Sequence, residues 1–169
     1  PPPISTLFPY TTLFRSQLAA SGIRLHHIDL GGGLGIRYRD EEAPTVASYL
    51  QPLLQKLRDR DLKILLEPGR RLVGNAGLLL TKVEYLKPGE VKNFAIVDAA
   101  MNDLARPALY DAWHDILPVT PHAGPEQSWE IVGPICESGD FLGRGRPLAL
   151  KPGDLLAIMT AGAYGAVQS

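Results

Sequence analysis

The single cysteine of the chain, Cys136, lies directly beside a carboxylate in a segment punctuated by glycine. The segment reads Gly133-Pro-Ile-Cys136-Glu137-Ser-Gly-Asp140, and its turn would hold both side chains in fixed directions. A thiol held within hydrogen-bond reach of a reacting atom is a competent general acid. Because a lone cysteine is more often an inert small hydrophobe than a catalyst, the segment by itself leaves both interpretations open.

Two further motifs each follow a short apolar run. In Gly31-Gly-Gly33-Leu-Gly35 the glycines let the backbone approach an anion closely and turn N–H groups toward phosphate. The G-x-G-x-x-G spacing of a dinucleotide site is not met, and a simple strand-to-helix turn is an equal alternative. In Glu67-Pro68-Gly69-Arg70 a carboxylate at a strand end, a proline-glycine turn and a guanidinium suit a charged heteroaromatic ring and an anion. The alternative is a surface ion pair of little energetic value.

Two tyrosines and an arginine complete the candidate set. Arg106 and Tyr110 belong to Arg106-Pro-Ala-Leu-Tyr110, and Tyr164 lies in Ala161-Gly-Ala-Tyr-Gly165. The guanidinium of Arg106 can bind a carboxylate at the distal end of a substrate. A pocket for lysine or ornithine, which have no carboxylate there, would not need this guanidinium. The alternatives are a surface loop in which Tyr110 packs on Arg106, and a tyrosine that caps a strand end.

Together, and in this order, these five blocks closely resemble those of the pyridoxal-phosphate-dependent diaminopimelate decarboxylases. The resemblance implies pyridoxal 5'-phosphate as cofactor, with Gly33 at its phosphate and Glu67 at its pyridinium nitrogen. Pro68, Gly69 and Arg70 would also line the cofactor, and Arg70 would touch substrate. The pyridinium, kept protonated, accepts electrons as the carboxylate leaves.

The resemblance also assigns the substrate, meso-diaminopimelate, which would be converted to L-lysine and carbon dioxide. Arg106 and Tyr110 would bind the distal amino-acid end, with Glu137 at the distal amine. Cys136 would protonate the carbon that loses its carboxylate, and Tyr164 would reach both cofactor and substrate. Because Cys136 and Glu137 would enter the partner's pocket, a homodimer with a composite active site is expected.

The elements that must position these residues change character along the chain. A strand at 24–30, a helix from Pro44 and a strand at 63–66 predict a parallel β-α-β unit. After Gly77 the pattern predicts β structure, with strands at 78–85, 93–98, 129–135 and 155–160 separated by Pro-Gly turns. The resemblance implies an α/β plus β fold: the C-terminal part of a (β/α)8 TIM-type barrel in residues 17–76, and a β-barrel or sandwich domain, truncated at its end, in 77–169.

Residues 1–16 are expected to be foreign to this fold. Thr6 to Ser16 reads, codon for codon, as the translation of a common short-read sequencing adapter, so we interpret 1–16 as an assembly artefact. The family's cofactor lysine belongs to an early barrel strand, and none of the lysines here lies in a matching motif. A C-terminal fragment, inactive and poorly stable alone, is therefore expected.

Composition excludes several other classes of protein. The chain has 169 residues, 45% of them hydrophobic and 21% charged, with a formal net charge of −1 and one cysteine. There is no basic excess for nucleic acid, no apolar run long enough for a membrane helix and no disulfide, so a cytoplasmic enzyme is expected. His26, His27, His114 and His122 show neither metal-ligand spacing nor a cysteine-protease motif. A decarboxylase for ornithine or arginine and a non-catalytic partner-binding relative are the alternatives.

Overall fold

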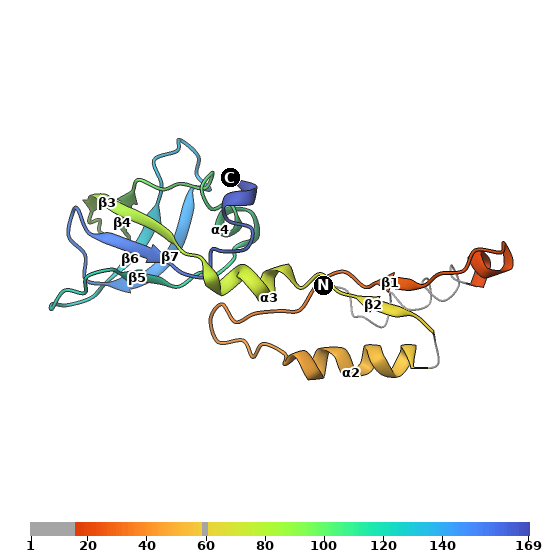
Figure 1. Cartoon of the computed structure of the whole chain (residues 1–169). Coiled ribbons are helices and arrows are strands. Elements are labelled where there is room, and N and C mark those ends of the chain that lie inside the picture. Colours follow the sequence, from red (N-terminus) through yellow and green to blue (C-terminus); the bar gives the residue numbers. More distant parts are fainter. Residues whose placement is uncertain (1–15, 59–60) are drawn as a thin grey trace. The chain divides into compact units, whose positions relative to one another are not determined.

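The structure is a computed structural model that describes residues 16–58 and 61–169, and these form two compact units. Unit 1 comprises residues up to Gly35 together with Pro44–Pro68, and unit 2 comprises Ile36–Ala43 together with Gly69–Ser169. Figure 1 follows the elements along the chain. Apart from Ser16, the expected adapter segment lies outside the described residues. The domain boundary expected near Asn75 to Gly77 stays a prediction for the complete protein.

Unit 1 is built on a parallel strand pair. Strand β1 (His27–Asp29) pairs with β2 (Lys63–Leu65), with Ile28 opposite Ile64 at the centre, and helix α2 (Val46–Leu57) forms the connection. The predicted order of strand, helix and strand is confirmed. β1 is shorter than expected because only its last residues find a partner strand.

Helix α2 begins at Val46, two residues later than the sequence suggested. Thr45 is its N-cap, and the Thr45 hydroxyl accepts a hydrogen bond from the Ser48 N–H at 3.1 Å, so Pro44 precedes the helix. Pro52 lies inside the helix rather than in its first turn. Of the apolar residues at helical spacing, Leu53 and Leu57 are buried, whereas Val46 and Leu54 are exposed within the described part of the chain.

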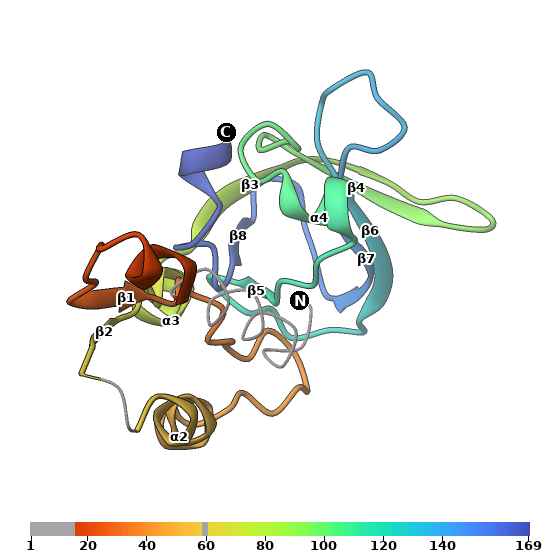
Figure 2. The ribbon, with the colours of Figure 1, turned by 90° about the vertical axis from the view of Figure 1, so that its right-hand side faces the viewer.

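Unit 2 is a single six-stranded sheet with the order β5-β8-β3-β4-β6-β7. Its pairings are antiparallel except for β4 and β6, which run parallel, and the two end strands β5 and β7 also contact each other. The sheet is therefore nearly closed, and in Figure 2 it curls around a common interior. The strands are β3 (Leu79–Lys87), β4 (Asn93–Val97), β5 (Ile116–Pro118), β6 (Gln127–Val132), β7 (Phe141–Leu148) and β8 (Leu155–Ile158). The helical segments are α3 (Gly69–Val73), η2 (Gly74–Ala76), α4 (Arg106–Tyr110) and η3 (Ala166–Gln168).

The four strands predicted for this region correspond to β3, β4, β6 and β8. Strands β5 and β7 were not predicted. β7 contains Gly143, Gly145 and Pro147, residue types that weaken or interrupt a strand, and its pairing with β6 is irregular at two points. The irregular pairing accommodates residues that a regular central strand would not.

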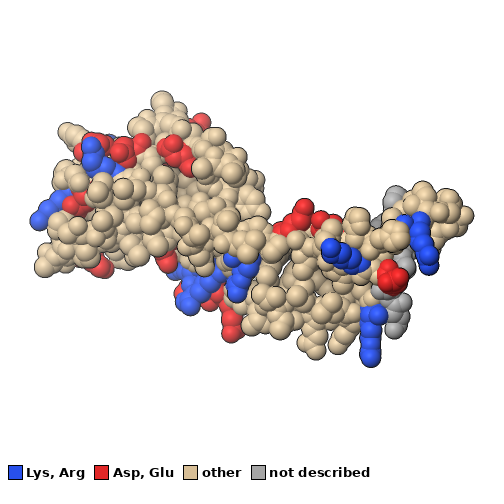
Figure 3. Space-filling view, viewed as in Figure 1, with Lys and Arg blue, Asp and Glu red and all other residues tan. Residues whose placement is uncertain are grey.

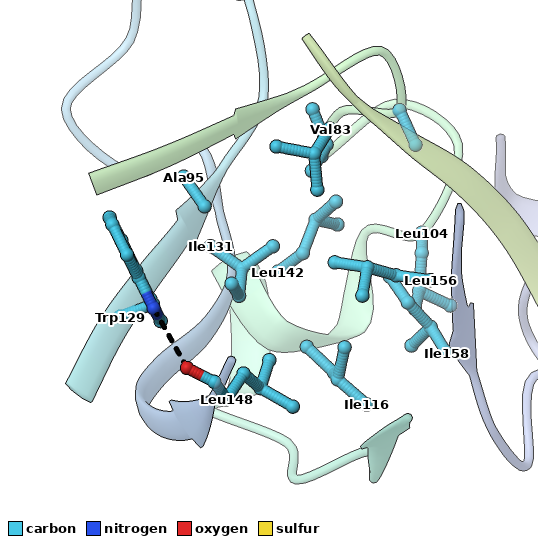
Figure 4. Close-up of a cluster of buried hydrophobic side chains, with 12 residues drawn as sticks. Val83, Ala95, Leu104, Ile116, Trp129, Ile131, Leu142, Leu148, Leu156 and Ile158 are labelled. Atoms are coloured by element: carbon cyan, nitrogen blue, oxygen red, sulfur yellow. Dashed lines mark hydrogen bonds between the residues drawn. The ribbon is translucent and has the colours of Figure 1, made fainter. Parts of the chain in front are cut away.

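The interior of the sheet is filled by apolar side chains from every strand (Figure 4). Trp129 is the largest of them, and its indole N–H donates to the Leu148 carbonyl at 3.0 Å, so its one polar atom is satisfied. Leu104, from the loop before α4, is fully buried in the same cluster. The remaining members are Val83, Ala95, Val97, Ala99, Ile116, Ile131, Leu142, Leu148, Leu156 and Ile158.

The surface carries charges of both signs. On the face seen in Figure 3, acidic and basic side chains are intermingled over unit 2. No helix among the described residues has the length and apolar character that crossing a bilayer requires.

Buried Thr81 joins β3 to the end of β4. Its hydroxyl donates to Asp98 Oδ1 at 2.6 Å and accepts from the Ala99 N–H at 3.0 Å, while the Lys82 N–H donates to the same carboxylate oxygen at 2.8 Å. These donors, the Thr81 hydroxyl first and the Lys82 N–H second, hold the pKa of Asp98 below its ordinary value. The bonds fix the chain direction where it leaves β4 toward α4.

Replacing Thr81 with valine should destabilise unit 2, because the Ala99 N–H and Asp98 lose a buried partner. We expect the free energy of unfolding of the complete protein to fall by about 1–3 kcal/mol in urea titrations at pH 7. A carboxyl whose folded pKa is lowered contributes stability that is present above its unfolded pKa, about 4, and is lost as pH falls through the folded pKa. The variant raises the pKa of Asp98, so acid unfolding should begin at higher pH.

Thr81→Ser is the matched control, since it keeps the hydroxyl. An equal loss of stability in the serine and valine variants would show that shape rather than hydrogen bonding matters at this position.

Candidate active site

The glycine loop begins directly after β1 and needs glycine at two positions. Gly31 and Gly33 have φ of +68° and +99°, the left-handed region that side chains disfavour. The Gly31 N–H donates to Asp29 Oδ1 at 2.8 Å. Among the hydrogen bonds of the described residues, none is donated by the backbone N–H groups from Gly32 to Gly35. These donors are therefore available to an anion.

The loop is held against the residue that follows β2. The Glu67 N–H donates to the Gly31 carbonyl at 2.8 Å, and a Cβ at Gly32 would lie 2.5 Å from the Glu67 carbonyl oxygen. From α2, the Tyr49 hydroxyl donates to the Gly32 carbonyl at 2.7 Å. The Glu67 side chain itself is exposed. The structure thus brings the loop of Gly33 and Glu67 together at the C-terminal ends of two parallel strands, where barrel enzymes carry their chemistry.

Pro68 and Gly69 do not form the isolated turn that the sequence suggested. Gly69 begins helix α3, so Arg70 lies on the first turn of that helix and is half-buried. The helix directs the arginine into unit 2.

Arg70 joins a cluster of cationic and aromatic side chains within unit 2. Its guanidinium carbon lies 5.0 Å from the centroid of the Tyr164 ring and 6.0 Å from that of Tyr38. The guanidinium of Arg106 lies over the same Tyr38 ring at 4.6 Å. All three geometries are cation–π contacts. Tyr38 therefore joins the two arginines, and Arg70 in turn contacts Tyr164.

Arg106 is buried and not a surface-loop residue. It opens α4, is 9% exposed, and its Nη1 lies 2.9 Å from Nε2 of His114. No ion pair to a carboxylate is formed by Arg106 in the described part of the chain. A buried guanidinium that forms no ion pair has the chemistry to accept an anion. Tyr110, at the other end of α4, is 67% exposed.

Tyr164 is held by a close backbone contact rather than by a strand end. It lies beyond β8 with φ of +59°, an uncommon value for a residue with a side chain. Upstream, the Ala161 N–H donates to the Gly77 carbonyl at 2.9 Å, and a Cβ at Gly77 would lie 2.6 Å from the Gly162 Cα. The two glycines let these segments touch, which places Tyr164 beside Arg70.

The turn that carries Cys136 and Glu137 is organised by the buried carboxylate of Asp140. Its Oδ2 accepts from the Ile135 N–H at 2.9 Å, and its Oδ1 accepts from the Met101 N–H at 2.7 Å. The first bond closes the turn between β6 and β7, and the second ties it to the loop after β4.

Both Cys136 and Glu137 are exposed at the tip of this turn. Glu137 Oε1 accepts from the Ser138 hydroxyl at 3.2 Å and from the Gly139 N–H at 3.4 Å. Within the described residues, no hydrogen bond, ion pair or ring contact joins either side chain to Arg70, Arg106 or Tyr164. The turn is built rigidly and presents its functional groups outward.

Sequence reasoning missed three residues that build these sites: Tyr38, His114 and Asp140. Tyr38 has a buried hydroxyl without a hydrogen-bond partner among the described residues. The sequence offered one signal for these residues, the short distance along the chain between Arg106 and His114. That spacing is common and does not by itself predict a contact. The described residues contain no group of three or more His, Cys, Asp and Glu side chains arranged to hold a metal ion.

Comparison with known proteins assigns the chain to a family. Residues 12–162 match the family model described as "Pyridoxal-dependent decarboxylase, C-terminal sheet domain". The chain belongs to the pyridoxal-dependent decarboxylase family. The expected resemblance to diaminopimelate decarboxylases and the expected cofactor class are thereby confirmed.

Named relatives in this family are closely similar. Over 153 residues the chain is 61% identical to a diaminopimelate decarboxylase of Pseudomonas fluorescens, covering 90% of this chain and 37% of that protein. It is 60% identical over 149 residues to one from Neisseria meningitidis, covering 88% and 37%. The crystal structure of diaminopimelate decarboxylase from Helicobacter pylori complexed with L-lysine matches with a TM-score of 0.83 and 43% identity, covering 91% of this chain and 38% of that chain. The chain thus spans little more than a third of the length of these pyridoxal-dependent decarboxylases.

Asp140→Asn should loosen the turn that carries Cys136, because both carboxylate oxygens of Asp140 accept N–H bonds and an amide offers one acceptor. The NH2 group of the asparagine then faces the second backbone N–H, so two hydrogen-bond donors oppose each other. We expect about 1–3 kcal/mol less unfolding free energy in urea titrations of the complete protein, together with a fall in kcat.

Asp103→Asn is the matched control in the neighbouring loop. Asp103 uses a single carboxylate oxygen, Oδ2, to accept from the Ala100 N–H at 2.8 Å, and an asparagine can rotate to keep that bond. If the two variants lose stability and kcat equally, Asp140 does not organise the turn in the way described.

Proposed function

We propose that the complete protein decarboxylates meso-diaminopimelate to L-lysine and carbon dioxide with pyridoxal 5'-phosphate as cofactor. The observation that carries the proposal is the convergence of Arg70 and buried Arg106 on Tyr38, next to Tyr164. Unit 1 would supply the last β-α units of a (β/α)8 barrel, and unit 2 would supply the sheet domain.

The cofactor's residues in this chain fit its chemistry. The free N–H groups around Gly33 suit a phosphate, and the exposed carboxylate of Glu67 can accept a hydrogen bond from a protonated ring nitrogen. When bound, pyridoxal phosphate withdraws the electron pair left by the departing carboxylate. Glu67 strengthens that withdrawal by keeping the nitrogen protonated. Pro68 and Gly69 would also line the cofactor.

Substrate class follows from Arg106. Diaminopimelate carries an amino-acid group at both ends, and the distal carboxylate would occupy the space beside a guanidinium that has no acidic neighbour in the described residues. Ornithine lacks that carboxylate and would leave a buried charge unpaired. Arg70 would contact the substrate from α3, and Tyr164 would bridge substrate and cofactor. The exposed Tyr110 would complete the distal subsite.

The outward-facing turn would act in the other subunit of a homodimer. Cys136 Sγ–H would donate its proton to the carbon that has lost carbon dioxide, and the thiolate would recover a proton from water. Glu137 would hold the distal ammonium group. Exposure of both side chains, without contacts to Arg70 or Arg106, supports a composite site of this kind. A cytoplasmic location fits the single, unpaired cysteine.

A substrate panel tests the proposal. The complete protein loaded with pyridoxal phosphate should release carbon dioxide from meso-diaminopimelate and discriminate against ornithine, arginine and lysine. Arg106→Gln should lower kcat/KM for diaminopimelate by about 10²-fold or more, since a hydrogen-bonded charge is lost, and should leave the weak rates on ornithine and lysine nearly unchanged.

Comparable turnover of ornithine or arginine would favour a decarboxylase for another basic amino acid. Absence of turnover on every substrate, with cofactor bound, would favour a partner-binding relative.

Subunit mixing tests the composite dimer. Cys136→Ala and Glu67→Gln subunits should each be nearly inactive, and hybrid dimers should regain one intact site because the two losses fall in different pockets. Random mixing should restore about a quarter of wild-type activity, because about half of the dimers are hybrids with one of two sites intact. Activity that does not rise above the mean of the two parents would refute shared sites.

A further inference from the structure

His114 is a fully buried histidine that the proposed reaction does not use. It lies between α4 and β5 and is 0% exposed. Both of its ring nitrogens have partners: Nδ1 lies 2.8 Å from the Met159 carbonyl oxygen, and Nε2 lies 2.9 Å from Arg106 Nη1. A histidine with two such partners has a fixed ring orientation.

The chemistry of the two partners assigns the tautomer. A carbonyl oxygen only accepts, so Nδ1 must carry the proton. A guanidinium only donates, so Nε2 must offer its lone pair. Only the neutral imidazole with a proton on Nδ1 makes both bonds. A protonated ring would place an N–H against the N–H of Arg106.

The surroundings of the ring favour the same state. Burial lowers the pKa of His114, the Met159 bond raises it, and the charges of Arg106 on α4 and Arg146 on β7 lower it, with Asp115 acting weakly in the opposite sense. The edge of the Tyr38 ring also packs on the imidazole, with ring centroids 5.3 Å apart and planes inclined at 79°. These contacts keep His114 neutral at physiological pH.

We infer that His114 is a positioning residue for Arg106. It binds one Nη1 proton and so fixes the rotation of the planar guanidinium over Tyr38, which leaves the remaining N–H groups aimed at the distal carboxylate of the substrate. Arg106 makes no ion pair within the described residues, so the imidazole is the acceptor that holds it before substrate arrives. Pre-orientation of a guanidinium reduces the cost of binding a carboxylate. The inference rests on the proposed function.

Steady-state kinetics of the complete holoenzyme test this role. His114→Phe keeps a ring but offers no acceptor, and should lower kcat/KM for meso-diaminopimelate about 10- to 100-fold, mostly through KM. His114→Gln retains an acceptor near the Nε2 position and should recover most of the loss.

A double-mutant cycle separates positioning from general support of the fold. If His114 acts through Arg106, the double variant His114→Phe, Arg106→Gln should be no worse than Arg106→Gln alone. Multiplying losses, or a kcat loss without a change in KM that glutamine does not recover, would overturn the inference. Thermal unfolding of each variant reports any loss of fold.

A spectroscopic readout does not depend on the substrate. In a long-range proton–nitrogen correlation spectrum of the holoenzyme labelled with ¹⁵N-histidine, His114 should be neutral with its proton on Nδ1, and its signals are identified by their loss in His114→Gln. A charged ring, or a proton on Nε2, would overturn the inference even if diaminopimelate is the substrate. If the wild-type enzyme does not act on diaminopimelate but the tautomer is as stated, the proposed function fails and the Arg106–His114 bond stands.

Discussion

Near-closure of the six-stranded sheet is the constraint on which unit 2 depends. A sheet that curls around one interior places every inward side chain in a dry space, so any polar group there needs a fixed partner. Thr81, Arg106, His114 and Asp140 are all buried, and each makes at least one short hydrogen bond. The requirement that buried polar groups be hydrogen-bonded therefore also fixes the directions of Arg106, His114 and Asp140 before any ligand binds.

The fold was predictable wherever one local pattern decided it. Apolar runs between Pro-Gly turns located β3, β4, β6 and β8, and helical spacing located α2. β7 was missed because Gly143, Gly145 and Pro147 argue against a strand, and its existence depends on β6 as a partner. Local propensity gives no information about a partner strand, so the order and near-closure of the sheet could not be predicted from the sequence.

The site was predictable in its residue types and less so in its geometry. Arg70, Arg106 and Tyr164 were named from their motifs, and the structure brings them together. Tyr38 and His114, which join them, belong to no motif. Tyr38 lies far from these residues in the chain, and His114 follows helix α4. Cation–π contacts and a bond between two ring or guanidinium nitrogens arise only after folding, so spacing gives no sign of them.

The strand order has a kinetic consequence. Within the described part of the chain β5 pairs only with β8, and β8 in turn pairs with β3, in a register that joins Leu79 to Ile158. Contacts between residues so distant in sequence form slowly, because a long loop must close before any bond is gained. During synthesis β5 must therefore wait, exposed, until Leu155–Ile158 have left the ribosome. Closure of the sheet, and with it the burial of the histidine that holds Arg106, is one of the last events in the folding of this unit.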